Sequence, residues 1–437
     1  MSGLIMAAQL ILGLSILVLL HELGHYLAAR AFGIKVEKFY LFFDAWKIKL
    51  FKFKKGDTEY GIGWLPLGGY VKIAGMIDES MDKEAMKEEP KPWEFRSKPA
   101  WQRLIVMVAG VFMNLILGVI IYTFVIYGYH KEYIPVSEVN TTGIYSYELG
   151  RELGFKTGDR IIAVDGDEVE RYKDVFSVLN YFGATITIDR NGSKVEVVIP
   201  DTLYRMLKSE NPKQFVEPHN FAFFVDSVIK DSPGEEAGLK KGDVFVSVNN
   251  VYTPVFGSFS EEIQRNKGKE VSLVIQRNSS LDTLMVVVDS TGKIGVGISD
   301  PPYKTKPYTL GSAINYGIVE ARQILVANIK GLGKVFSGQE DARESVAGPI
   351  KIATMYGADW DWMRFWSFTG LLSLILAFMN ILPIPALDGG HVVFLLIEVV
   401  SGRKIPDNVM EKIQVVGMIL LLTLMALIVG NDIFGLF

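Results

Sequence analysis

The sequence predicts a multi-pass α-helical membrane protein with four transmembrane helices, a membrane-associated β-hairpin, and two small α/β domains inserted between the second and third helices. Three observations support this fold class. The 437 residues are 49% hydrophobic and only 22% charged, with a mean hydropathy of +0.25, which is high for a soluble enzyme. Long uncharged runs occur in four places. A long stretch with ordinary soluble patterning separates the second run from the third.

Each apolar run is about long enough for a helix to cross ~30 Å of hydrocarbon. The runs are Gly3–Leu20, Leu104–Tyr127, Phe365–Leu387 and Ile413–Gly430. Lys and Arg are absent before the first loop and after the last run, but they are frequent in residues 28–103 and 401–412. The positive-inside rule therefore places both basic loops in the cytoplasm and both termini outside. We expect transmembrane helices within residues 1–34, 101–128, 346–400 and 408–437.

The composition limits the kinds of partner and of metal ligand that the protein can have. A net charge of -4, without a basic stripe interleaved with aromatics, argues against a nucleic-acid partner. The chain has no cysteine and five histidines. A catalytic metal would therefore have to be held by His, Asp or Glu.

The first cytoplasmic loop, residues 35–100, contains a glycine-rich segment. Residues 60–73 alternate glycine with bulky apolar side chains, which suits a short β-hairpin. If this hairpin re-enters the membrane, its edge could pair with an extended peptide and replace hydrogen bonds that unwinding removes. Gly61, Ile62 and Gly63 are the candidate substrate-binding residues. A hairpin that only rests on the membrane surface is the alternative.

The outer segment contains an internal repeat. The sequence GFKTGDRIIAVDG at residues 154–166 recurs as GLKKGDVFVSVNN at residues 238–250. Gly-Asp is turn chemistry, and the alternating apolar residues after it predict a half-buried strand. Both copies resemble the PDZ domain of bacterial proteases, so we expect PDZ-like domains at 129–208 and 209–303. Peptides or the ends of cleaved substrates are the ligands that this resemblance implies, and simple packing modules are the alternative.

Residues 304–345 follow the second module. Residues 306–336 have the apolar periodicity of an amphipathic helix, with charged residues on the other face. We expect this helix to lie on the outer membrane surface. A solvated surface helix would have the same pattern.

The first apolar run leads into His21-Glu-Leu-Gly-His25. On a helix, positions i and i+4 share one face, so both imidazoles can reach one metal ion. Glu22 is then placed to contact a water at that ion, as the general base of a zinc hydrolase does. Ionisable residues within an apolar run usually mark a functional interior. The motif therefore predicts one zinc site, with Glu22 as the catalytic residue.

A third ligand is needed, because catalytic zinc normally has three protein ligands. The best candidate is Asp388, which follows two helix-breaking prolines, Pro383 and Pro385. His391 lies three residues further on, and we expect it to form a hydrogen bond in the outer shell of the site, with direct ligation as the alternative.

These motifs together resemble the site-2 protease family of intramembrane zinc metalloproteases, and most closely its bacterial branch of sigma-E regulators. The resemblance extends over nearly the whole chain and also includes Gly110-Val-Phe-Met-Asn114 and the stretch from Asn380 to His391. It implies that His21, His25 and Asp388 bind zinc and that Glu22 is the general base. Asn380 and Asn114 are candidates for holding the substrate backbone, with helix packing as the alternative.

The resemblance implies regulated intramembrane proteolysis of single-span membrane proteins, such as anti-sigma factors, or of remnant signal peptides. It also implies a bacterial inner membrane location. The termini and PDZ-like domains would be periplasmic, the zinc site would lie near the cytoplasmic side, and the modules would admit only shortened substrates. One alternative is a membrane-tethered PDZ adaptor or chaperone with a vestigial metal site, although all four metal-site residues are intact. A metal transporter is a further alternative, but it would need ligands on both sides.

Overall fold

The fold was analysed in a computed structural model, which describes residues 2–434 apart from 67, 77–88, 130–131, 177–179, 181–182, 201–202, 204–214, 220–222, 300–303, 306–307 and 339–346. The chain divides into two compact units, which are Lys131–Lys306 and the two flanking segments Met1–His130 and Pro307–Phe437 taken together. The domain boundaries expected near 208 and 345 lie outside the described residues.

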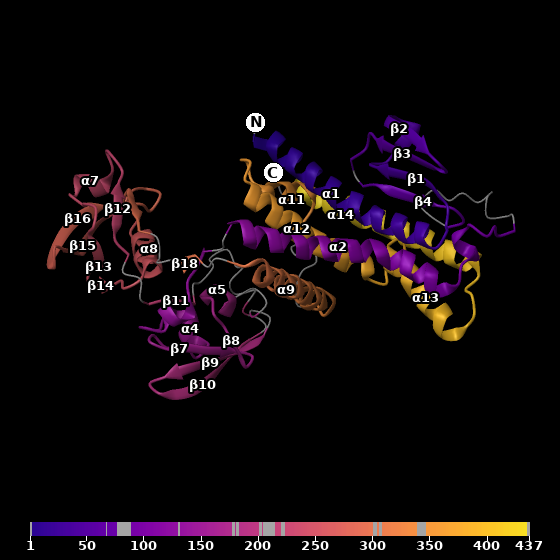
Figure 1. The fold of residues 1–437 in the computed structure, drawn as a ribbon. Coiled ribbons are helices and arrows are strands. Elements are labelled where there is room, and N and C mark those ends of the chain that lie inside the picture. Colours follow the sequence, from indigo (N-terminus) through magenta and orange to yellow (C-terminus); the bar gives the residue numbers. More distant parts are fainter. Residues whose placement is uncertain are drawn as a thin grey trace. The chain divides into compact units, whose positions relative to one another are not determined.

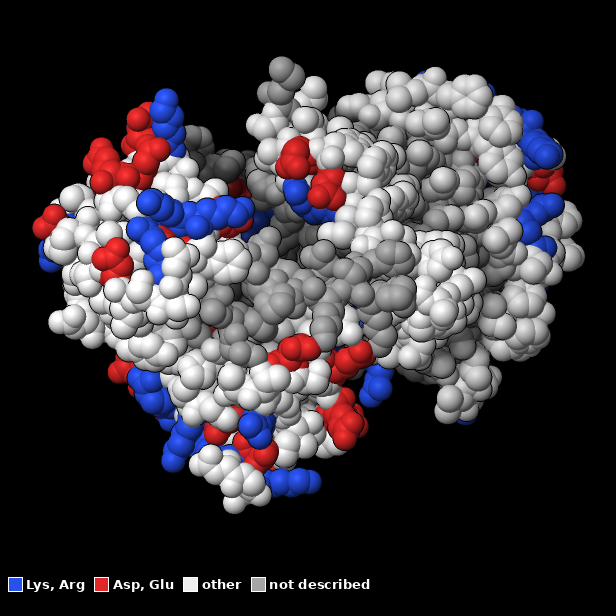
Figure 2. Space-filling model, turned by 60° about the vertical axis from the view of Figure 1, so that its left-hand side comes forward, with Lys and Arg blue, Asp and Glu red and all other residues white. Residues whose placement is uncertain are grey.

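Among the described residues, four helices are long and apolar enough to span a membrane, as the sequence predicted. They are α1 (Ser2–Ala31), α2 (Ala100–Tyr129), α12 (Trp362–Ile381) and α14 (Asp407–Phe434). Helix α2 is central, because it packs against α1, α12, α9 (Leu310–Phe336) and α13 (Asp388–Ser401) (Figure 1). In Figure 2 the surface of the unit that contains these helices is largely free of charged side chains. Side chains of both charges are scattered over the unit Lys131–Lys306.

The region expected as one transmembrane helix at 346–400 consists of three helices. A short helix, α11 (Pro349–Tyr356), precedes α12, and α13 begins at Asp388. Pro383 and Pro385 lack the N–H that a continuing helix needs, so α12 ends at Ile381 and the chain turns before α13. This break places Asp388 in the first turn of a new helix.

The first loop forms a four-stranded sheet with the order β2-β3-β1-β4. The strands are β1 (Val36–Leu41), β2 (Lys49–Lys55), β3 (Thr58–Gly63) and β4 (Tyr70–Ile73). Strand β1 pairs in parallel with β3 and antiparallel with β4. The predicted hairpin of residues 60–73 is therefore wrong, because β1 lies between its two arms.

Local packing explains the different topology. A Cβ at Gly61 would lie 2.4 Å from the Tyr40 ring, and a Cβ at Gly69 would lie 2.7 Å from the Tyr40 carbonyl oxygen. The glycines thus give β1 the space to enter the sheet. The alternating glycines suggested a hairpin, but two of them are needed because β1 approaches closely.

Helix α9 is the amphipathic helix expected within 304–345, but it packs along a transmembrane helix. Its small residues Ala313, Gly317 and Ala321 are buried. A Cβ at Gly317 would lie 2.5 Å from Thr123 Oγ1, and Ala321 packs with Tyr122 in one cluster. The buried side of α9 therefore covers the C-terminal half of α2, in the manner of close helix packing through small residues.

The second unit contains two modules of matching topology. The first has a sheet of order β10-β9-β7-β8 and the second has a sheet of order β14-β13-β15-β16. In the first module the elements are β5 (Glu132–Tyr133), α3 (Val136–Val139), β6 (Ile144–Ser146), α4 (Glu148–Glu152), β7 (Arg160–Val164), β8 (Asp167–Glu168), α5 (Tyr172–Val175), β9 (Ala184–Arg190), β10 (Ser193–Ile199) and β11 (Val216–Pro218), which pairs with β6. In the second they are β12 (Val225–Val228), α7 (Pro233–Glu236), β13 (Val244–Val248), β14 (Val251–Tyr252), α8 (Phe256–Arg265), β15 (Glu270–Arg277), β16 (Ser280–Val287) and β17 (Val296–Ile298), which pairs with β12. The last strand of the unit, β18 (Lys304–Thr305), pairs with β5. Each module has its own apolar core.

The Gly-Asp of each repeat is held by an arginine further along the chain. Asp243 Oδ2 accepts hydrogen bonds from Arg277 Nη2 and from the Lys240 N–H, both at 2.7 Å. Asp159 is bonded in the same way by Arg190. Burial alone would raise the pKa of the Asp243 carboxyl, but these two donors outweigh burial and hold that pKa below its usual value. In each repeat the aspartate therefore forms an ion pair with a later arginine, in addition to its place in a turn.

We expect Arg277→Met to destabilise the second module by about 3 kcal/mol, because the Asp243 side chain is 1% exposed and would lose its charge partner. Native-state hydrogen exchange of the β13 and β15 amides in the full-length protein measures this change. Arg265→Met is the control, since Arg265 is 70% exposed and its loss should cost less than ~1 kcal/mol. Equal effects of the two substitutions would contradict a stabilising role for the Asp243–Arg277 pair.

The same pair predicts a pH dependence. The folded pKa of Asp243 lies below its unfolded value of about 3.9. The stabilisation from the pair is therefore complete above the unfolded pKa and is lost as the pH falls through the folded pKa. In Arg277→Met this acid-dependent part of the stability should be smaller than in the wild-type protein.

Candidate metal centre

Helix α1 carries His21, Glu22 and His25 in its second half. At a rise of 1.5 Å per residue, His21 lies about 28 Å from the start of the helix. The two imidazoles are one turn apart on the same face, and their Nε2 atoms are 3.2 Å apart. The i, i+4 spacing thus brings two nitrogen donors to one point, as the sequence predicted.

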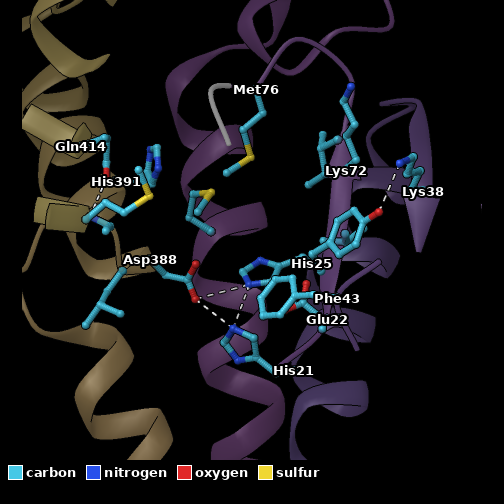
Figure 3. A pocket seen from close by; sticks show the side chains of 18 of the residues that line it. His21, Glu22, His25, Lys38, Phe43, Lys72, Met76, Asp388, His391 and Gln414 are labelled. Carbon is cyan, nitrogen blue, oxygen red and sulfur yellow. Dashed lines mark hydrogen bonds and ion pairs between the residues drawn. The ribbon is translucent and has the colours of Figure 1, made fainter. Parts of the chain in front are cut away.

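Asp388 completes a triangle with the two histidines. Its Oδ2 atom lies 3.1 Å from His21 Nε2 and 3.3 Å from His25 Nε2. Donors bound at 2.0–2.1 Å to a tetrahedral ion would be separated by about 3.3 Å. The same oxygen is buried and accepts no hydrogen bond among the described residues. A buried, unpartnered carboxylate oxygen at this spacing fits a divalent cation between the three side chains (Figure 3).

The outer nitrogens of both rings are also held. His25 Nδ1 lies 2.8 Å from the Val106 carbonyl oxygen, to which it can only donate. This bond fixes the tautomer that leaves Nε2 free to bind a metal. The Asn114 amide lies 3.3 Å from His21 Nδ1, and its Oδ1 is buried without a partner. If the Asn114 amide is rotated by 180° about its last side-chain bond, its oxygen faces His21 and accepts a hydrogen bond from the Nδ1–H.

Asn114 therefore contacts a histidine rather than the cavity. It was a candidate for substrate binding in the sequence, but it is 1% exposed. Ser373 Oγ donates to its main-chain carbonyl oxygen at 2.7 Å, which ties α12 to the same point of α2. The Asn114 side chain thus contacts His21 and does not line the cavity.

Close packing of α1 on α2 gives the histidines their place. A Cβ at Gly24 would lie 2.4 Å from the Ala109 carbonyl oxygen, and a Cβ at Gly110 would lie 2.3 Å from His25 Nε2. Both positions therefore need glycine. In the sequence Gly110 is only one position of a motif, and its contact with the His25 ring appears only in the tertiary structure.

The three donor side chains line a cavity of about 410 Å³. Glu22 lines the same cavity and follows His21 in the chain (Figure 3). Strand β4 forms one side with Tyr70, Val71 and Lys72, and α14 contributes to the lining as well. The lining is mixed, with charged groups among apolar ones. The cavity therefore offers space for a peptide segment beside a metal site and a carboxylate.

The strand that lines the cavity is not the one that the sequence predicted. Gly61, Ile62 and Gly63 lie in β3, which pairs with β1 on one side and with β2 on the other. The prediction that these residues offer a free edge is wrong, because both edges of β3 are occupied. The edge strand that lines the cavity is β4.

The two remaining candidates lie close to the metal site. Asn380 Nδ2 is 3.4 Å from His21 Nε2, so its amide reaches the point where the three donors converge. His391 lines the cavity, and its ring lies apart from the three converging side chains in Figure 3. Among the described residues the cluster of close donors comprises only His21, His25 and Asp388. The preference for His391 outside the ligand set agrees with this geometry.

A membrane-embedded metal hydrolase is the class of protein that this fold and site define. The model of peptidase family M50 matches residues 9–424. The chain is 30% identical to the regulator of sigma E protease of Haemophilus influenzae, over 99% of both chains. It is 29% identical to a protein of Xylella fastidiosa and 28% identical to one of Clostridium perfringens, both named as zinc metalloproteases, over 98% and 97% of each chain.

The chain therefore belongs to peptidase family M50, the family of site-2 proteases. It is a membrane protein and an intramembrane zinc protease. The adaptor alternative is not favoured, because the relatives are named as proteases over almost their full length.

Proposed function

We propose that His21, His25 and Asp388 hold one zinc ion and that Glu22 is the general base for cleavage of a peptide bond inside a transmembrane segment. The observation that carries this proposal is the triangle of donor atoms at 3.1, 3.2 and 3.3 Å, in which the Asp388 oxygen is buried and has no hydrogen-bond partner among the described residues. When bound, zinc supplies a Lewis acid that polarises a carbonyl group and lowers the pKa of water. The side chains provide the rest of the chemistry.

Each side chain has a distinct role in this proposal. Glu22 accepts the proton of the attacking water and returns it to the leaving amine. Asn114 and the Val106 carbonyl keep the two imidazoles in the required orientation. Asn380 is close enough to the site to donate a hydrogen bond to the substrate backbone, which keeps its predicted role open to test.

The substrate would bind as an extended strand beside β4. A transmembrane helix must unwind before its carbonyl groups can be attacked, and its freed backbone groups need new partners inside the membrane. Strand β4 is an edge strand that lines the cavity with Glu22 and Asp388. Addition of a strand to such an edge supplies these hydrogen bonds.

Disulfide crosslinking tests this placement, since the chain has no cysteine of its own. We expect Lys72→Cys on β4, in a Glu22→Gln background, to crosslink to a cysteine placed beside the cleavage site of a bound substrate. The control is Lys52→Cys on β2, the opposite edge of the same sheet. A crosslink from Lys52→Cys that equals the one from Lys72→Cys would contradict pairing at β4.

The likeness to the regulator of sigma E protease supports a substrate class and an orientation. We propose that substrates are single-span proteins of the anti-sigma-factor type or remnant signal peptides, cut in the bacterial inner membrane. The distribution of Lys and Arg supports termini and modules on the periplasmic side and a zinc site nearer the cytoplasm. The two repeated modules are proposed to be PDZ-like domains that bind or exclude substrate ends.

Reconstitution with purified single-span substrates in liposomes tests the proposed function. We expect cleavage within the apolar segment of the substrate, loss of cleavage after zinc is removed by a chelator, and recovery when zinc is restored. Substrate in liposomes without the protein is the control. Cleavage that persists in zinc-free protein would contradict the assignment.

A further inference from the structure

The loop before Asp388 donates a main-chain N–H to the side chain of Gln414 on α14. In this loop Pro383 and Pro385 have no N–H to donate. The Ile384 N–H donates to the Leu382 carbonyl at 2.7 Å and the Leu387 N–H donates to the Ile384 carbonyl at 3.1 Å, so both bonds stay within the loop. The Ala386 N–H instead donates to Gln414 Oε1 on α14 (Figure 3).

The residue that makes this bond has an unfavourable backbone conformation. Ala386 has φ of 74°, in the left-handed region that residues other than glycine rarely adopt. Such a conformation persists only where the surrounding structure enforces it. Ala386 is two residues before Asp388, so the bond to Gln414 acts close to the proposed zinc ligand.

The Gln414 amide has a defined orientation. Its Oε1 accepts from Ala386, and its Nε2 is buried without a partner among the described residues. Reversal of the amide would bring two donors together, so the oxygen must face the loop. This makes Gln414 an acceptor that cannot be replaced by an apolar side chain without leaving the Ala386 N–H unpaired.

A second contact joins the same helix to the same loop. A Cβ at Gly417 would lie 2.3 Å from Pro385 Cβ and 2.5 Å from the Pro385 carbonyl oxygen. The remaining apolar part of α14 is mostly exposed, and Asp432 at its far end accepts hydrogen bonds from Ile350 and Lys351 of α11. Gln414 and Gly417 therefore fix α14 to the metal loop one turn apart.

We propose that Gln414 is a positioning residue for zinc binding, which holds the Ala386 backbone and thereby sets the place of Asp388. The proposal rests on the assignment of Asp388 as a zinc ligand. Loss of an outer hydrogen-bond partner of a metal site typically weakens metal affinity 10- to 100-fold. Here the partner is Gln414, which bonds to Ala386, two residues before Asp388. Gln414 lies on α14, which carries none of the three close donors.

Chelator competition on the full-length protein without substrate measures the zinc dissociation constant directly. We expect Gln414→Met and Gly417→Ala each to weaken zinc binding by about 10- to 100-fold. Gln414→Glu keeps an acceptor for the Ala386 N–H and should retain tight binding. Gly430→Ala is the matched control, because it makes the same change on the same helix with no atom within 4 Å of the new methyl group.

Full zinc occupancy of the variants at saturating zinc shows that their sites are folded. Wild-type affinity in Gln414→Met would overturn the proposal, and so would equal weakening in Gly417→Ala and Gly430→Ala. If Gln414→Met cannot be filled with zinc, Gly417→Ala decides between the outcomes. A wild-type protein that binds no zinc would overturn the ligand assignment itself, which is a distinct result.

Discussion

Replacement of Glu22 by Gln is expected to reduce cleavage by at least about 100-fold while one zinc ion per chain is retained. Glu22 lines the cavity beside His21 but is not among the three converging donors. The carboxamide has nearly the same size, but it cannot take a proton from water. Zinc content and single-turnover cleavage of a reconstituted single-span substrate measure the two effects separately.

The matched control for this substitution is Glu320→Gln on α9. It makes the same chemical change in the same unit, away from the cavity lining. Cleavage by Glu320→Gln should equal that of the wild-type protein. Equal cleavage by Glu22→Gln and the wild-type protein would remove Glu22 from the reaction, and loss of zinc from Glu22→Gln would assign it a structural role instead.

Replacement of Asp388 by Asn is expected to deplete the protein of zinc and to abolish cleavage. The carboxylate oxygen is the only anionic donor in the described cluster, and a neutral amide is a weaker ligand for a cation. The zinc affinity should fall by more than the 10- to 100-fold that loss of an outer partner costs. Metal analysis after dialysis against a chelator measures the change.

Asp359→Asn is the control for this second substitution, since the Asp359 side chain is 74% exposed in the turn before α12. It should keep full zinc occupancy. His391→Asn is also informative, because His391 lines the cavity outside the close cluster. Full zinc in Asp388→Asn, with loss of zinc in His391→Asn, would transfer the ligand role to His391.

The presence of four spans and the cluster of metal-binding side chains were predictable because their signals are local. Uncharged runs of sufficient length define spans, and the i, i+4 spacing of His21 and His25 fixes one face of a helix. The proline pair before Asp388 indicated a break that could bring a carboxylate into the interior. In each case the physical requirement acts over a few neighbouring residues.

The features that sequence reasoning missed depend on contacts between distant segments. In the sheet Tyr40 of β1 packs against Gly61 of β3 and Gly69, which precedes β4, and no sequence periodicity indicates which strands become neighbours. Gln414 carries no motif, because its role arises from a bond to Ala386 across 28 residues. Asn114 was a candidate from its motif, but its contact with His21 appears only in the tertiary structure.

The strand order also constrains how the catalytic side of this sheet can assemble. Strands β2 and β3 are joined by a tight turn and can pair as soon as they are synthesised, whereas the parallel pair β1 and β3 must close a loop that contains all of β2. Among the four strands of this sheet, β4 comes last in the sequence, and it pairs only with β1. The edge that lines the cavity is therefore the last part of the sheet to be synthesised, and until β4 is available the edge of β1 that it covers is open to other extended segments.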